Sequence, residues 1–157
     1  MKKIAGALVI IAVVMAACTK DEQKSRVELL TQKEWKLSGL KSTDSQGIEI
    51  DFFVNLQLNN NCNLDNILSF GTDGTFTVDE GTNVCNDTSY FFKSGTWVLT
   101  PDETKLNIIN GNIYYVYTLN EVSENKMVFD AQGNTSSRKS SLKSFAEVVT
   151  FRFTFSH

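Results

Sequence analysis

Short segments with period-two alternation, separated by turn residues, constrain the fold of this chain more than any other feature. The clearest is segment 145–155, whose odd positions include Phe151, Phe153 and Phe155 while its even positions are mostly small or polar. Such alternation is typical of a β-strand that covers a core with one face. We therefore expect an all-β protein.

Further strand candidates lie between turn signals made of Gly, Asn, Asp and Pro. They are 35–41, 66–70, 75–78, 91–100, 106–110, 113–122 and 126–131. Segment 48–58 is apolar at every even position, which favours a strand; a short helix closing one barrel end is the alternative. A short helix is also expected over 26–33, with Ser25 as its N-cap.

About eight short antiparallel strands joined mainly by hairpins form a meander, and closure into an up-and-down barrel would hide both of its edges. A β-sandwich is the alternative, because a count of hairpins does not distinguish the two folds. The interior of a barrel of about eight strands is either packed with side chains or holds one small ligand. We expect a single barrel domain over 26–157.

The first 17 residues have the pattern of a secretory signal peptide. Lys2 and Lys3 precede an uncharged apolar run, 4–17, that is too short to cross a bilayer. The Met-Ala-Ala that precedes Cys18 resembles the lipobox of bacterial lipoproteins, in which a lipid is attached to the cysteine thiol and the chain is cut just before it. We expect a lipid anchor on Cys18 and a location at the outer membrane. A plain secreted protein is the alternative.

The other two cysteines then form a pair. Lipidation of Cys18 leaves Cys62 and Cys85 in an oxidising compartment, which predicts a disulfide between them, with two buried free thiols as the alternative. Residues 18–25 make a lipidated and polar tether. Within it, 19–23 resemble the export signal of surface lipoproteins, which slightly favours the cell surface over the periplasmic side. An ordinary solvated tether is the alternative.

Charge and residue types exclude several classes of function. The formal net charge is −3, whereas a nucleic-acid partner requires a clustered positive face. The single histidine, His157, removes histidine triads and multi-histidine zinc sites. Asp51 and Glu147 are the acids nearest to apolar strand faces, and neither has an identifiable partner for glycosidase chemistry. We expect no enzyme activity, no catalytic residue and no cofactor.

Two polar regions invite a binding interpretation. Oxygen-rich loops around Asp73, Asp79 and 59–66 could hold Ca²⁺, but their spacing does not match an EF-hand loop and turn chemistry explains them equally well. We therefore expect no metal site. The basic cluster of Arg138, Lys139 and Lys143 lies in a serine-rich stretch and is interpreted as a solvated connection.

One set of features occurs along the chain in a recognisable order: Cys18, Trp35 after a short helix, Cys62 with Asp65, Leu68-Ser69-Phe70 leading into Asp73-Gly74-Thr75, Gly81, Cys85 and Gly95-Thr96-Trp97. With these features the chain resembles, from residue 29 to 155, the lipocalin-like domains of small bacterial lipoproteins. The resemblance implies an up-and-down barrel and binding of an apolar molecule, and it brings no catalytic residues.

A ligand pocket in such a barrel would be lined by aromatic and aliphatic residues on barrel-facing positions. These are Trp35, Leu37, Phe70, Phe76, Trp97, Leu99, Tyr115, Tyr117, Phe129, Phe151 and Phe153. The first expectation is a non-enzymatic, lipid-anchored envelope lipoprotein whose barrel binds a small apolar or amphipathic molecule. The alternative is a structural or protein-interaction lipoprotein with a filled core, acting beside another envelope protein.

Overall fold

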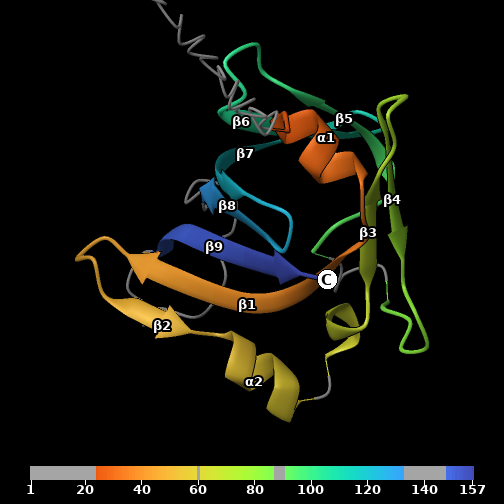
Figure 1. The fold of residues 1–157 in the computed structure, drawn as a ribbon. Helices are drawn as coiled ribbons and strands as arrows, with labels where there is room; N and C mark the ends of the chain where they lie inside the picture. Colours follow the sequence, from red (N-terminus) through yellow and green to blue (C-terminus); the bar gives the residue numbers. More distant parts are fainter. Residues whose placement is uncertain (1–23, 60, 87–90, 133–147) are drawn as a thin grey trace, which may run out of the picture.

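In the computed structural model of the chain, one antiparallel sheet closes on itself as a barrel (Figure 1). The structure describes residues 24–59, 61–86, 91–132 and 148–157. The strands are β1 (Trp35–Asp44), β2 (Glu49–Asp51), β3 (Ile67–Phe70), β4 (Thr75–Asp79), β5 (Gly95–Leu99), β6 (Lys105–Asn110), β7 (Ile113–Val122), β8 (Lys126–Gln132) and β9 (Val148–Ser156). The helical elements are α1 (Arg26–Thr31), α2 (Phe53–Leu58) and the 3₁₀ turn η1 (Cys62–Leu64).

The last strand pairs with the first, and this pairing closes the barrel. The β1–β9 register runs from Lys36 opposite Ser156 to Asp44 opposite Val148, with β-bulges on the way. Between them, β3 to β9 follow one another as neighbours, so β1 and β3 to β9 make an eight-stranded up-and-down barrel. The predicted meander barrel is confirmed, and the β-sandwich alternative is wrong because the two outer strands of the meander bond to each other.

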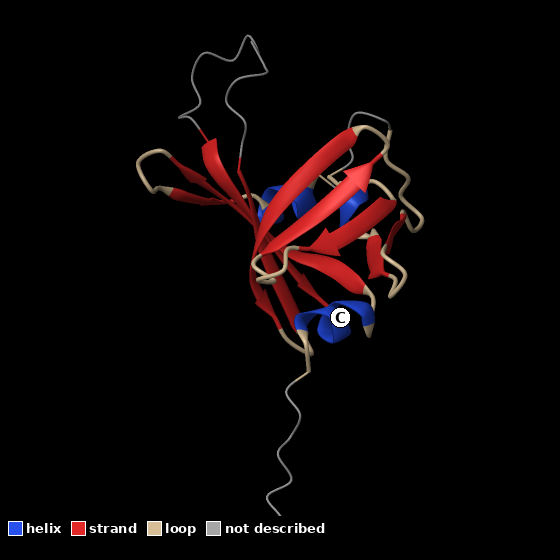
Figure 2. Ribbon diagram, turned by 90° about the horizontal axis from the view of Figure 1, so that it is seen from above, coloured by secondary structure: helices blue, strands red, loops and turns tan. Residues whose placement is uncertain are grey.

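The two ends of the barrel differ. We call the end that carries α1 and the 123–125 turn the α1 end, and the end that carries β2, α2 and η1 the loop end (Figure 1). β2 belongs to the loop end because it pairs with the far half of β1, at Lys41–Thr43. The β1–β2 hairpin projects away from the barrel wall (Figure 2).

Helix α1 confirms the predicted N-terminal helix and is held against the barrel at both of its ends. Ser25 and Glu28 form a capping box at its start, which satisfies backbone donors that a helix start leaves free. The indole Nε1 of Trp35 donates to the carbonyl of Leu30, and both residues are fully buried. Among the residues that the structure describes, no helix is long and apolar enough to cross a membrane.

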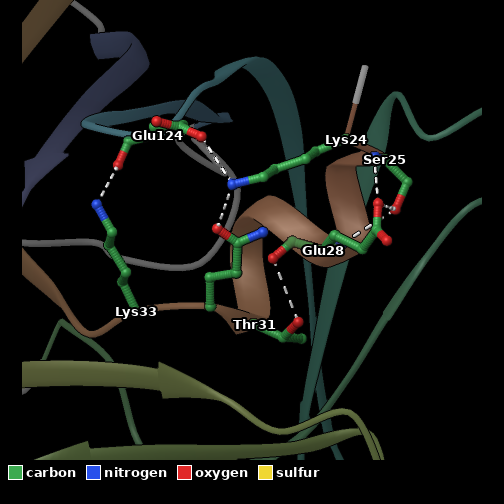
Figure 3. A network of polar contacts seen from close by, with 7 residues as sticks. Lys24, Ser25, Glu28, Thr31, Lys33 and Glu124 are labelled. Carbon is green, nitrogen blue, oxygen red and sulfur yellow. Dashed lines mark hydrogen bonds and ion pairs between the residues drawn. The ribbon is translucent and has the colours of Figure 1, made fainter. Parts of the chain in front are cut away.

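Polar contacts also tie α1 to the 123–125 turn (Figure 3). Lys24 Nζ lies 2.7 Å from Glu124 Oε1, and Lys33 Nζ donates to the carbonyl of Glu124 at 3.1 Å. The Lys24–Glu124 ion pair is solvent-exposed, so it adds little stability and mainly fixes the position of the helix.

The prediction of one strand over 48–58 is wrong for most of that segment. Only β2 is strand, and α2 follows it after a single residue. Asp51 Oδ1 accepts a hydrogen bond from the backbone N–H of Phe53 at 2.9 Å, which starts the helix. Phe52 and Leu56 both pack against the core. Because these positions are four apart, the period-two pattern of this segment also supplies one apolar stripe of a helix.

The predicted strand over 91–100 is also too long at its start. β5 begins at Gly95, and Phe91 and Phe92 belong to the loop that precedes it. Gly95 sits where two strands approach closely, since a Cβ there would lie 2.0 Å from the carbonyl oxygen of Ile109. Strand pairing therefore starts at this glycine, and the two phenylalanines are left free to turn elsewhere.

A disulfide joins the two long connections of the loop end, as predicted. Cys62 of η1 and Cys85 of the β4–β5 loop are bonded, with their Cα atoms 5.1 Å apart. The bond links residues 23 apart in sequence, so it restricts the unfolded chain considerably.

We expect the double substitution Cys62→Ala and Cys85→Ala to lower the free energy of unfolding by about 3 kcal/mol, because the unfolded chain regains loop entropy. Urea denaturation of both proteins measures the difference. Dithiothreitol should destabilise the wild type by a similar amount and leave the double variant unchanged. A wild type that unfolds identically with and without reductant would contradict the structural importance of this bond.

Candidate functional site: the barrel interior and its loop end

Aromatic rings fill the barrel interior below the loop end. The ring of Phe92 lies between 5.2 and 6.0 Å, centroid to centroid, from those of Tyr117, Phe129, Phe153 and Phe155. Several of these pairs meet edge to face, a favourable arrangement for aromatic rings. Phe92 is only 8% exposed, although it comes from a loop and not from a strand. It therefore acts as a plug in the barrel.

The loop that carries Phe92 is fixed to η1. The backbone N–H of Phe91 donates to Oδ1 of Asn63 at 3.0 Å, and Asn63 is almost fully buried. The disulfide from Cys62, the residue before Asn63, reaches Cys85 in the same loop. The plug is thus held by two neighbouring residues of η1.

Asp65 provides a third attachment for this loop. Its Oδ2 accepts hydrogen bonds from the backbone N–H groups of Thr82 and Asn83, each at 2.9 Å, and from the Thr82 hydroxyl. These bonds, led by the one from Asn83, lower the pKa of the Asp65 carboxyl, while burial opposes them. Gly81 has a φ of 64°, and a Cβ there would lie 2.7 Å from Asp65 Oδ2.

The acidic turn residues serve local backbone donors. Asp73 Oδ1 accepts from the N–H of Thr75, and Asp79 Oδ1 accepts from the N–H of Gly81. Within the described ranges, no group of three or more His, Cys, Asp or Glu side chains lies together. These contacts agree with turn chemistry, the reading that the sequence favoured over Ca²⁺ ligation.

Ten of the eleven residues predicted to line the interior belong to the core or pack against it. Eight are buried: Trp35, Leu37, Phe70, Phe76, Trp97, Tyr117, Phe129 and Phe153. Leu99 and Phe151 are partly buried against this core. Burial raises the pKa of the Tyr117 hydroxyl. The pattern therefore identified the inward faces of the strands correctly.

Tyr115 is the exception, because it is 39% exposed. It lies on the same face of β7 as Tyr117, and the two rings stack at 6.4 Å. Described pairing between β7 and β8 begins only at Tyr117 opposite Ala131, so Ile113–Val116 extend past it and all four are exposed. Alternation locates a face correctly but does not show where the barrel ends.

The interior void that the structure describes beside the Phe92 ring is small. A void of about 10 Å³ lies beside Phe91, Phe92 and Phe155, which is room for about one water. Pockets for small molecules usually measure about 300–1,000 Å³. A larger hollow of about 270 Å³ lies between Val78, Phe92 and Asn110, where β4 and β5 separate after their short pairing. Phe92 lines both spaces.

Sequence reasoning missed Phe91 and Phe92 as functional residues because it placed them in a strand. Two consecutive phenylalanines break strict alternation, and this break was the available signal that they leave the strand. Other predicted features lie outside the described residues. These are the signal peptide 1–17, Cys18, the tether residues 19–23, Glu147 and the basic cluster Arg138, Lys139 and Lys143.

The outer face of the barrel carries a groove lined by ion pairs. Its volume is about 340 Å³, and it lies over β1, β2, β7, β8 and β9. Lys41 forms an ion pair with Glu49 at 2.5 Å, and Lys126 forms one with Glu121 at 2.8 Å. The guanidinium of Arg152 donates to both carboxylate oxygens of Asp130, at 2.8 and 2.9 Å. The list of lining residues is Lys41, Glu49, Asn120, Glu121, Lys126, Val128, Arg152 and Thr154.

We expect Asp65→Asn to weaken the acid sensitivity of folding. A carboxyl whose pKa is lowered by folding stabilises the protein above its unfolded pKa, near 4, and this stabilisation is lost as the pH falls through the folded pKa. The variant should be less stable at pH 7 and lose less stability between about pH 5 and pH 2. Urea midpoints across that range measure both effects.

Thr82→Val is the companion variant, because it removes one of the three donors to Asp65 and keeps the carboxylate. It should change stability at pH 7 in the same direction and by less. Identical acid slopes for the wild type and Asp65→Asn would show that this carboxylate does not couple folding to pH.

No model of a known protein family matches this chain, and neither does any curated protein.

Proposed function

We propose that this protein is a lipid-anchored lipoprotein of the cell envelope, held at the outer membrane and without enzyme activity, that works through contacts with other envelope proteins. The observation that carries this proposal is the ring of Phe92, which fills the barrel interior among Tyr117, Phe129 and Phe153. Because this ring occupies the described part of the interior, the surface of the barrel is the better candidate to carry the function.

The proposed anchor also orients the barrel. Lipidated Cys18 would be joined to Ser25, the N-cap of α1, by six residues, which span about 20 Å at most. The α1 end then faces the lipid surface, and the loop end with β2 and α2 faces away from it. On this arrangement the loop end is the part most accessible to other proteins, and it would stand on the cell-surface side if 19–23 act as an export signal.

The loop end carries the apolar surface that such contacts need. Ile48, Ile50 and Val54 are each half exposed, and Leu58 is 82% exposed. Single exposed apolar residues are ordinary, whereas exposed apolar residues that gather in one patch indicate an interaction surface. These four lie within eleven consecutive residues, 48–58.

A second candidate function is binding of a small apolar or amphipathic molecule. The hollow of about 270 Å³ beside Val78, Phe92 and Asn110 supports it, since Phe92 also lines the small interior void. In this case Phe92 covers a binding site. In the first case it is a permanent part of the core.

Phe92→Ala distinguishes the two. If Phe92 is core, its loss should lower the free energy of unfolding by about 3–5 kcal/mol, the usual effect of a buried Phe→Ala change. Phe91→Ala, at the partly buried neighbouring position, is the matched control and should cost clearly less. Urea denaturation gives these values. A cost below about 1 kcal/mol for Phe92→Ala, with a small molecule co-purifying in native mass spectrometry, would favour ligand binding instead.

The anchor is tested with radiolabelled palmitate in the producing bacterium. We expect the wild type to incorporate label and to enter the detergent phase on phase separation, because acyl chains on Cys18 would hold it in a leaflet. Cys18→Ser should do neither. Cys62→Ser, which removes a different cysteine, should keep the label, and label retained in Cys18→Ser would overturn the proposed anchor.

A further inference from the structure

Strand β2 has a hydrogen-bonding edge that no described strand covers. It is at the end of the strand order and pairs with β1 alone, at Lys41–Thr43. The N–H of Asp44 donates to the carbonyl of Ile48, and the N–H of Phe52 donates to the carbonyl of Leu40. Since backbone groups alternate in an antiparallel pair, those of Glu49 and Asp51 point away from β1.

The side chains of this segment sort by chemistry onto its two faces. Ile48 and Ile50 lie on one face, where they are 54% and 50% exposed. Glu49 and Asp51 lie on the other, and all three residues of β2 are exposed. A strand added beside β2 would therefore meet apolar groups on one face and carboxylates on the other.

A row of charges crosses four strands of the sheet and ends at this edge. Asp130 of β8 is opposite Arg152 of β9, Arg152 is opposite Lys41 of β1, and Lys41 is opposite Asp51 of β2. Arg152 and Lys41 carry like charges, and each forms an ion pair with a carboxylate, Arg152 with Asp130 and Lys41 with Glu49. Opposite charges that face each other across strands attract, as those of Lys41 and Asp51 do. The row ends on a carboxylate, so a basic residue is the complementary next member.

This charge arrangement selects among possible occupants of the edge. A second copy of the chain, paired antiparallel about Ile50, would place Glu49 opposite Asp51 of the other copy, and like charges in that position are destabilising. An anionic lipid surface would be repelled by the same two carboxylates. An extended segment with basic residues opposite Glu49 and Asp51, and an apolar residue opposite Ile50, satisfies both faces.

We propose that the open edge of β2 binds, by addition of a strand, an extended segment of a partner protein with basic–apolar–basic alternation. The backbone groups of Glu49 and Asp51 form hydrogen bonds with the added strand. The side chains of Glu49, Ile50 and Asp51 determine which segment binds. This inference rests on the proposed function, because it names the class of partner that the loop end would bind.

The test uses the full-length lipidated protein in a non-ionic detergent and a fluorescent nine-residue peptide of alternating lysine and valine. Fluorescence anisotropy should show saturable binding, and a glutamate–valine peptide of the same length should not bind. Glu49→Lys should weaken binding of the basic peptide at least five-fold. Glu124→Lys is the matched control, because it also removes an exposed Lys–Glu pair and changes the net charge equally, at the α1 end. It should leave binding within two-fold.

A second peptide separates strand addition from attraction of charge alone. Methylation of the backbone nitrogens of its lysines, the residues opposite Glu49 and Asp51, removes the hydrogen-bond donors that face β2 and keeps every charge. Strand addition predicts loss of binding, together with slowed amide exchange at Glu49 and Asp51 for the unmethylated peptide. Equal binding of the methylated peptide, equal weakening by Glu49→Lys and Glu124→Lys, or self-association through β2 would overturn the inference.

The two proposals fail in different ways. If the basic peptide does not bind while the palmitate label on Cys18 and the cost of Phe92→Ala are as expected, the edge inference is wrong and the filled, anchored barrel stands. If the label is absent or the interior holds a ligand, the proposed function fails, whatever the result with the peptide.

Discussion

Hydrogen bonding between β1 and β9 is the constraint on which the other features of this molecule depend. It consumes one edge of β1 along nearly its whole length. The other edge is divided, because β3 pairs only with Trp35 and Lys36 and β2 pairs further along, with Lys41–Thr43. Closure therefore hides the edges of the meander. It also leaves β2 outside the ring, where no strand of the described residues pairs with its outer edge.

The packing of side chains inside the barrel also depends on this closure. Eight strands enclose a space that side chains can fill, and here a loop residue, Phe92, joins the side chains of the strands in that space. Phe92 enters from the β4–β5 loop, and η1 holds that loop through Asn63 and the Cys62–Cys85 bond. Three unlike interactions, a disulfide, an amide hydrogen bond and the carboxylate of Asp65, thus keep one ring in place. Three separate attachments of one loop are expected if Phe92 is a permanent core residue, and they fit less well with Phe92 as part of a movable lid.

Much of the fold could be predicted because alternation and turn residues report on local structure. The inward positions Phe129 and Phe153 were found by parity alone, and both are buried. Segment 48–58 could not be resolved in this way, since spacing of Phe52 and Leu56 suits a strand and a helix equally. The position of Phe92 depends on contacts with residues 25 to 63 positions away in sequence, and no local pattern contains them.

Period-two hydrophobicity, the spacing of turns and the count of cysteines were enough to predict an antiparallel meander and to favour a barrel with a Cys62–Cys85 bond, because each of these depends on nearby residues or on simple pairing. The pairing of β1 with β9 excluded the β-sandwich. Whether the barrel is hollow, and where its surface can bind, depends on distant segments meeting. Only the folded chain places Phe92 inside and leaves Glu49 and Asp51 on an open edge. Long-range packing determines the position of Phe92, and strand order determines the edge of β2; a local sequence pattern predicts neither.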